Sequence, residues 1–326
     1  MRGKFYVALI VLAVVLTWSS AAFAWGYAVH AWAADSYGKM GGNKNLNEVY
    51  GALLPDTFNQ YLFSLPCFGD IYYLTHFSGF MNVEYAQKTG MEKGTAYGFL
   101  GHNNDWGLDA TAHTSSMTTC EGNPYVICKA AELAEVLPAE VNLPVVGTIT
   151  VYPLTWLDLD GDSIPDISPV MAAELYHGLV EYTIDLKMKE VDPDIGLLLQ
   201  EAAEQRSDKV PGLMVEAFVS EPAFSCIDTA SRSTFIEISE ATGRQIIYDF
   251  GSILAQPYPA DLYGVAELMA AMGAGFLGLP EPPPGMDIMV AGYLVKAQEL
   301  VDASFLAEIN ASAVFVDEQM KALGYK

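Results

Sequence analysis

The feature that most constrains the fold is a helical spacing of apolar residues, which recurs in long segments of the chain. In residues 170–190, 233–255 and 286–322, apolar side chains return every three or four positions, as in an α-helix that buries one face. Residues 138–167 differ, because VNLPVVGTITVYPLTW is typical of short strands or a hairpin. The 326-residue chain is therefore expected to be mainly α-helical, with an inserted, partly β segment at about residues 118–168.

The first 24 residues have the layout of a secretory signal. Two basic residues precede an apolar run at 5–16, and AFA at 22–24 has the small-x-small pattern of a signal peptidase site. The apolar run is shorter than the roughly 20 residues that a membrane-spanning helix needs. Cleavage after Ala24 would give a secreted or periplasmic protein that begins at Trp25. Retention as an uncleaved anchor is the alternative.

The chain is strongly acidic. It has 40 Asp and Glu residues against 16 Lys and Arg, for a formal net charge of −24. Such a charge keeps a protein soluble but repels nucleic acid and anionic membrane surfaces, so a nucleic-acid polymer is a disfavoured but not an excluded partner. Bound divalent cations would offset part of the charge, and a solvated acidic surface is the other interpretation.

The cysteines number four, at Cys67, Cys120, Cys128 and Cys226. An even number in an exported chain permits disulfides. Cys120 with Cys128 would close a small loop and leave Cys67 to pair with Cys226, but three pairings are possible and the sequence does not select one.

The segment GHNNDWGLDATAH is dense in metal-binding residue types. His102, Asp109 and His113 are spaced for one face of a helix, and Asp105 lies near that face. Neutral imidazole is the commonest metal ligand. We therefore interpret the segment as a metal site, against the alternative of a polar helix surface.

Three other segments contribute candidate ligands. His177 and Glu181 are one helical turn apart, so both side chains can reach one ion. Asp56 directly follows a proline, and His76 lies among aromatic residues. Taken alone, Asp56 is equally a helix cap and His76 a core histidine.

In this order the residues resemble the zinc-dependent phospholipase C / P1 nuclease superfamily. Its members carry a mature N-terminal Trp, a His, an Asp, a His, a His-x-x-x-Asp-x5-His helix and a final His-x-x-x-Asp/Glu. The matching positions, which use all five histidines, are Trp25, His30, Asp56, His76, His102, an Asp, His113, His177 and Glu181.

The resemblance implies a multi-helical phospholipase C/P1 nuclease-like fold that holds three zinc ions. It covers about residues 25–190, and residues 191–326 form a C-terminal helical region of unknown role. By resemblance, the first zinc would be held by Asp56, His76, His102 and the intervening Asp, the second by His113, His177 and Glu181, and the third by His30 with the α-amino nitrogen and carbonyl oxygen of Trp25. The intervening Asp would be shared between two ions.

The chain departs from the family pattern between His102 and His177. The spacing from His102 to His113 is one residue longer, and no Asp stands four residues after His102. Asp109, one helical turn before His113, is the predicted bridging ligand, with Asp105 as the alternative. The spacing from His113 to His177 is far longer than usual, which matches the predicted insertion.

The function implied by the resemblance is hydrolysis of phospholipids on the glycerol side of the headgroup phosphate, at transient contact with a membrane surface. Zinc would activate the attacking water, and Asp56 would orient or deprotonate it. The motif PDTF and Glu181 are typical of the phospholipase C branch, whereas the short spacing from Trp25 to His30 is typical of the nuclease branch. The alternatives are a P1-type nuclease or 3′-nucleotidase and a non-catalytic, metal-stabilised binding module.

Tyr73 matches, by resemblance, an aromatic residue that helps to cage a choline headgroup in the phospholipase C branch, where its ring face would attract a cation. Ala28 and Thr57 stand where a choline-specific site would have an acid and a tyrosine, which argues against choline selectivity.

A separate calcium site is predicted in DLDGDSIPD. Its carboxylates occupy positions 1, 3, 5 and 9 of an EF-hand-like loop, although Ser163 replaces the usual glycine and Pro169 the final glutamate. The alternative is a solvated acidic turn. The candidate ligands are Asp158, Asp160, Asp162 and Asp166.

Overall fold

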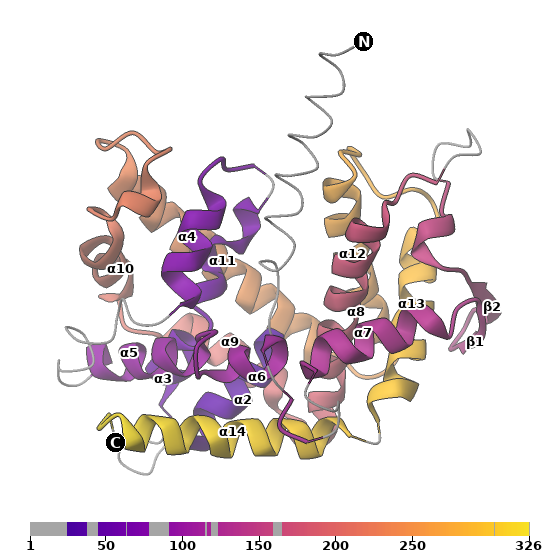
Figure 1. Ribbon diagram of the computed structural model, residues 1–326, viewed down its shortest axis with the longest axis horizontal. Helices are drawn as coiled ribbons and strands as arrows, with labels where there is room; N and C mark the ends of the chain where they lie inside the picture. The colour runs from indigo at the N-terminus through magenta and orange to yellow at the C-terminus, as the bar shows by residue number, and fades with distance from the viewer. Residues whose placement is uncertain are drawn as a thin grey trace.

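The computed structural model describes residues 25–37, 45–62, 64–77, 91–114, 116–118, 123–158, 165–302 and 304–325. Over these residues the chain is mainly helical and contains one two-stranded sheet (Figure 1). The prediction of a mainly α fold is confirmed, while the family-specific fold stays a prediction. Within the same residues, no helix is both long and apolar enough to cross a membrane.

The secondary-structure elements follow one another in the order shown in Figure 1. They are α2 (Tyr27–Tyr37), α3 (Leu46–Gly51), the 3-10 helix η1 (Pro55–Tyr61), α4 (Phe68–His76), α5 (Met91–His102), α6 (Leu108–His113), α7 (Tyr125–Glu135), β1 (Ala139–Leu143), β2 (Gly147–Val151), η2 (Leu154–Trp156), α8 (Pro169–Val191), α9 (Ile195–Gln205), α10 (Val210–Phe218), η3 (Pro222–Phe224), α11 (Arg232–Leu254), α12 (Ala260–Phe276), α13 (Met286–Val301) and α14 (Phe305–Ala322).

Helix α8 carries two candidate ligands, and its first turn shows why it begins where it does. The hydroxyl of Ser168, at the N-cap, accepts a hydrogen bond from Met171 N at 3.2 Å. Pro169 follows at the first helical position, where a missing N–H costs nothing. The predicted helix at 170–190 is therefore confirmed, as is the one at 233–255, which is α11.

The inserted β segment is confirmed as a hairpin. Strands β1 and β2 pair antiparallel, with Ala139 opposite Val151 and Leu143 opposite Gly147. The hairpin contacts α13 and stands at the right in Figure 1.

The helical spacing predicted at 286–322 is confirmed, and the structure divides this segment into two helices, α13 and α14. Helix α13 packs on α8 and α12, whereas α14 runs beneath α2 and α6 (Figure 1). The chain must change direction between these two surfaces. Residue Ser304 stands at the turn, and its N–H donates to Val301 O at 3.0 Å.

One hydrophobic core extends across the end of α8. It runs from Trp25 to Met320 without a break at residue 190. Helices α9 and α11 approach closely within it, because a Cβ on Gly196 would lie 2.6 Å from Ala255 N. The helices of 191–326 are thus packed into the body that carries the candidate ligands.

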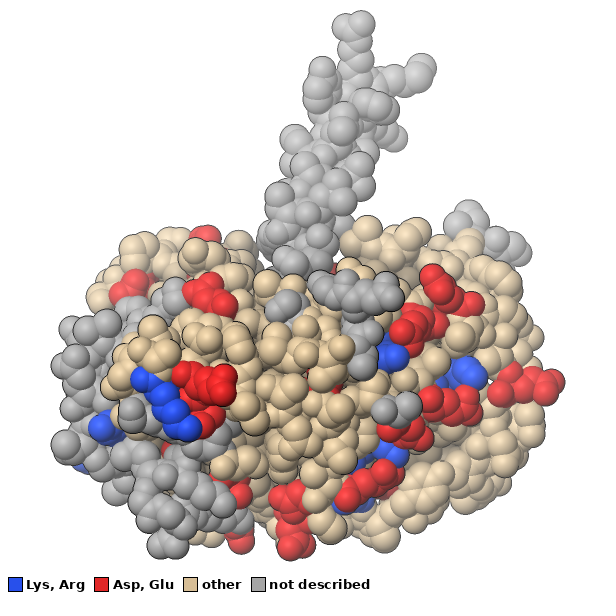
Figure 2. Space-filling model, turned by 60° about the horizontal axis from the view of Figure 1, so that its bottom comes forward, with Lys and Arg blue, Asp and Glu red and all other residues tan. Residues whose placement is uncertain are grey.

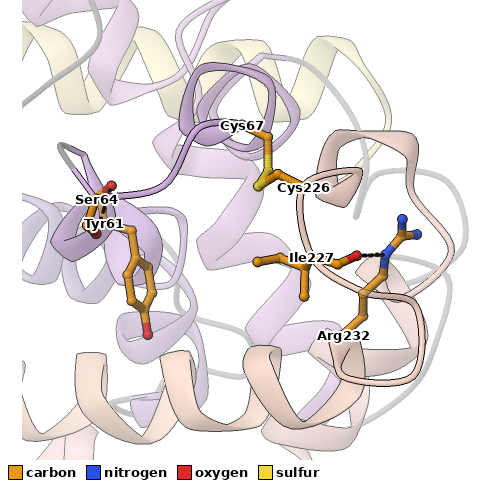
Figure 3. The surroundings of a disulfide bond; sticks show 6 residues. All are labelled: Tyr61, Ser64, Cys67, Cys226, Ile227 and Arg232. Atoms are coloured by element: carbon orange, nitrogen blue, oxygen red, sulfur yellow. Dashed lines mark hydrogen bonds between the residues drawn. A yellow bond between two sulfur atoms is a disulfide. The ribbon is translucent and has the colours of Figure 1, made fainter.

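Two long-range links join the C-terminal helices to the N-terminal half. Cys67 is bonded to Cys226 (Figure 3), which is one of the pairings left open by the sequence. Cys120 lies outside the described residues. The second link is buried: Arg206 Nε lies 2.5 Å from Glu240 Oε1, which also accepts a hydrogen bond from Tyr50 OH at 2.8 Å.

The acidic composition is visible at the surface. On the face drawn in Figure 2, Asp and Glu side chains are more widespread than Lys and Arg, and the basic groups lie next to acidic ones. This face is consistent with the repulsion of polyanions inferred from the net charge.

Candidate metal centre

Histidine and carboxylate side chains converge from six helices into three groups, and the atoms of each group lie within 4.8 Å of one another. Two of the groups share His102, and the third shares no residue with them. The three groups are His30, His102 and Asp109; Asp56, His76 and His102; and His113, His177 and Glu181.

The first group is built around Asp109, which has no exposed surface. Its Oδ1 lies 3.0 Å from His30 Nε2, and its Oδ2 lies 3.1 Å from His102 Nε2. None of these four atoms has a hydrogen-bond partner within the described part of the chain. A buried polar atom without a partner is costly, and a cation bound between the carboxylate and the imidazoles would remove that cost.

The second group shares His102 with the first. Asp56 Oδ1 lies 3.2 Å from His76 Nε2 and 3.6 Å from His102 Nε2. Asn59 Nδ2 donates a hydrogen bond to the same oxygen at 2.7 Å. Asp56 enters from η1, where Pro55 at the first position starts the short helix.

The third group joins α6 to α8. The Nε2 atoms of His113 and His177 lie 3.1 Å apart, which is closer than two unprotonated ring nitrogens stay without a proton or a cation between them. Glu181 Oε1 lies 2.8 Å from His177 Nε2 and 3.8 Å from His113 Nε2. Burial raises the pKa of Glu181 well above its ordinary value.

The electrostatics of the first group favour a bound positive charge. Burial raises the pKa of Asp109, but the neighbouring His102 and His30 outweigh it and hold that pKa well below its usual range. Burial lowers the pKa of His102, yet Asp109 and Asp56 raise it to about 9. The buried carboxylates thus favour positive charge at His102, which a bound divalent cation would also supply.

Hydrogen bonds behind the rings fix which nitrogen faces inward. The Nδ1–H of His102 donates to Ala52 O at 2.8 Å, that of His76 to Tyr72 O at 3.2 Å, and that of His113 to Asn104 Oδ1 at 3.2 Å. A carbonyl oxygen only accepts, so the donor must be the ring nitrogen. Each ring thus presents Nε2 to the cluster, which is the usual arrangement of histidines that bind metals.

The expectation that His102, Asp109 and His113 lie on one helix is wrong. Helix α5 ends at His102 and α6 begins at Leu108. Between them, Asn103 Oδ1 accepts the backbone N–H groups of residues 105, 106 and 107 at 2.9, 2.9 and 3.2 Å. This turn brings Asp109 back into the cluster and leaves Asp105 exposed, outside all three groups.

Trp25 lies beside the cluster. Its side chain is buried, donates from Nε1 to Thr111 Oγ1 at 2.9 Å and stacks on Tyr125 at 5.7 Å. An adjoining cavity of about 30 Å³ has room for about one water. It is lined by Trp25, Gly26, Tyr27, Asp56, Asn59, Glu181 and Tyr182. Residues 1–24 lie outside the described part, so cleavage after Ala24 stays a prediction.

The other predicted residues are not brought to the cluster. Tyr73 is 65% exposed and stacks on Phe77, and it does not line the cavity. Asp158 and Asp166 are exposed. Asp160 and Asp162 lie outside the described residues, so the calcium prediction stays open.

Two residues at the site escape the sequence analysis. Asn104 donates from its backbone N to His76 O at 2.6 Å and holds His113 through its side chain; the Asn pair after His102 is its only sequence signal. Asp185 continues the four-residue spacing of His177 and Glu181 along α8. That repeated spacing is a signal for one helical face.

No protein-family model, no curated protein and no solved structure matches the chain. Its chemistry is therefore inferred from the side chains. Three groups of imidazoles and carboxylates, two of which share His102, are suited to hold divalent cations.

Proposed function

We propose that the chain is a secreted or periplasmic zinc-dependent phosphodiesterase of the phospholipase C type. The observation that carries this proposal is that two of the three ligand groups share His102, whose Nε2 lies 3.1 Å from Asp109 Oδ2. Mixed imidazole and carboxylate ligands suit zinc, and shared ligands hold neighbouring ions close enough to act on one phosphate.

When bound, clustered zinc neutralises phosphate oxygens and lowers the pKa of water. The contribution of the chain's own residues is to orient the attacking water. Asp56 faces a cavity with room for about one water, and Asn59 fixes its carboxylate at 2.7 Å. Asp56 is thus the residue proposed to orient the attacking water and to take its proton.

The substrate class is supported by a cleft between α7 and α8. It has a volume of about 450 Å³, and His113 and His177 stand at its wall. The remaining lining is largely apolar, as suits hydrocarbon chains next to a phosphate. It consists of Pro124, Ile127, Ala130, Ala131, Ala134, Ala173, Glu174 and Tyr176. A phospholipid has both a phosphate and hydrocarbon chains.

The second candidate is a P1-type nuclease or 3′-nucleotidase, favoured by the five-residue spacing from Trp25 to His30. A calcium ion in the 158–166 loop would order the insertion and take no part in the reaction.

The test is a comparison of substrates on the zinc-reconstituted chain. We expect hydrolysis of short-chain phosphatidylcholine that exceeds hydrolysis of 3′-nucleotides, and loss of both in His102→Ala. Ala173→Trp should slow the reaction with phospholipid more than that with a chromogenic phosphodiester, because it fills the cleft. The matched control is Ala230→Trp, at an exposed turn. A faster reaction with nucleotides would select the nuclease, and no turnover with zinc bound would select the binding module.

A further inference from the structure

Helix α8 presents ionisable side chains at four-residue spacing, at His177, Glu181, Asp185 and Lys189, and Asp185 is not a candidate ligand. Asp185 is completely buried. Its Oδ1 accepts the backbone N–H of Ala28 at 3.0 Å and that of Val29 at 3.2 Å. These amides belong to the first turn of α2, where helix N–H groups have no partner within the helix. Asp185 therefore caps the N-terminus of α2 with a side chain from another helix.

The other oxygen of Asp185 faces Gly26. A Cβ at Gly26 would lie 2.3 Å from Asp185 Oδ2 and 2.4 Å from Cγ, which no side chain tolerates without displacement. Within the described residues, Oδ2 has no hydrogen-bond partner. The carboxylate thus occupies the space that any larger residue at position 26 would need.

The held segment connects two candidate ligands. Trp25 precedes Gly26, and His30 follows Val29 directly. The segment is also held at Trp25, whose indole donates a hydrogen bond to Thr111 Oγ1 and stacks on Tyr125. Asp185 is the contact that holds its backbone on the side of α8.

Stability alone is a poor explanation for this carboxylate. Burial raises the pKa of Asp185 to about 8, against the lowering effect of the two backbone N–H groups. A carboxyl group whose pKa is raised by folding lowers stability near neutral pH, because the unfolded chain ionises more readily.

We propose that Asp185 is a positioning residue that holds the segment Trp25–His30 against the metal centre, and that Gly26 is required to admit its carboxylate. The role in metal binding rests on the proposed function, whereas the placement of the segment does not.

The first measurement is amide hydrogen exchange of residues 26–31 in the metal-free chain, expressed with its own leader. Asp185→Ala and Asp185→Leu, which remove the acceptor oxygen, should accelerate exchange there, while α11 keeps its protection. Asp261→Asn removes another buried carboxylate, one that contacts Lys189 of α8, and should leave residues 26–31 unchanged. Asp185→Leu keeps the branched shape of the side chain, so it remains informative if Asp185→Ala does not fold. Unchanged exchange in the variants that fold would overturn the proposal.

The second measurement is a double-mutant cycle with Gly26. Gly26→Ala alone should accelerate exchange of the segment, because the new methyl meets the carboxylate. In the Asp185→Ala background the same methyl has room, so Gly26→Ala should add little further acceleration. Equal effects in both backgrounds would contradict the pairing.

Zinc binding supplies the functional readout. Asp185→Leu should weaken zinc at the group containing His30 by about 10- to 100-fold, as expected for a residue that positions a ligand. The group of His113, His177 and Glu181 should keep its affinity. If exchange changes as expected but no variant or wild-type chain turns over a phosphodiester, the positioning role stands and the proposed activity fails.

Discussion

Asp109 Oδ2 lies 3.1 Å from Nε2 of His102, although α5 ends at His102 and Asp109 belongs to the next helix. The turn at 103–107 reverses the chain between them, so two residues close in sequence meet face to face. With Oδ1 at 3.0 Å from His30, Asp109 has one oxygen for each of two imidazoles. This geometry is consistent with the proposal that Asp109 is a bridging ligand.

The bridging role predicts the effect of Asp109→Asn. The amide has one weaker acceptor and no charge, so zinc should be lost from the groups containing His30 and His102 and kept by the group containing Glu181. Zinc content by atomic spectroscopy and zinc titration measure this. Asp105→Asn, at the exposed alternative position, is the control. If Asp105→Asn loses zinc and Asp109→Asn keeps it, the bridging ligand is Asp105 and not Asp109.

Asn104 should affect zinc binding although it belongs to none of the three ligand groups. Its Oδ1 accepts Nδ1–H of His113 at 3.2 Å and thereby directs Nε2 toward His177. Asn104→Ala should weaken zinc binding or activity by about 10- to 100-fold. Asn142→Ala, on the exposed face of β1, should have no effect. Equal zinc affinity in the two variants would show that Asn104 does not position His113.

Metal removal should destabilise the fold. Asp109 and Glu181 are buried and lack hydrogen bonds for the oxygens that face the cluster, within the described residues. Ligand at about 1,000 times its dissociation constant stabilises by roughly 4 kcal/mol. A chelator should therefore lower Tm, and added zinc should restore it, whereas magnesium should not. The same Tm with and without zinc would argue against a metal centre.

The buried pair of Arg206 and Glu240 should contribute to stability. Their side chains are 7% and 1% exposed, and Tyr50 OH donates to the same carboxylate. Removing one partner of a buried pair costs about 3–5 kcal/mol, so Glu240→Ala should lower the free energy of unfolding by about that amount in urea titration. Glu299→Ala breaks the solvent-exposed pair with Lys296 and should cost about 0–1 kcal/mol. Similar losses would contradict the burial argument.

Local patterns predict the helices well, because apolar spacing reports which face is buried. The regions 170–190 and 233–255 correspond to α8 and α11 within one or two residues. The break at 302–304 has no such signal, since the two helices on either side are both amphipathic and only their packing partners differ.

The candidate site is predictable in its residue types but not in its geometry. The order of the five histidines indicates a metal centre, whereas the turn between α5 and α6 depends on Asn103 capping three consecutive amides. The role of Asp185 is harder to predict than this turn, because its partners are backbone amides 156 and 157 residues away. A backbone donor carries no residue-type signature, so only the fold reveals it.

The most direct test of the central claim is phospholipid hydrolysis by the purified chain as zinc is removed and restored. The account predicts that chelation abolishes turnover of short-chain phosphatidylcholine, that zinc restores it, and that His102→Ala fails to recover with zinc. Turnover that persists in the chelated chain, or that is equal in His102→Ala, would contradict the account.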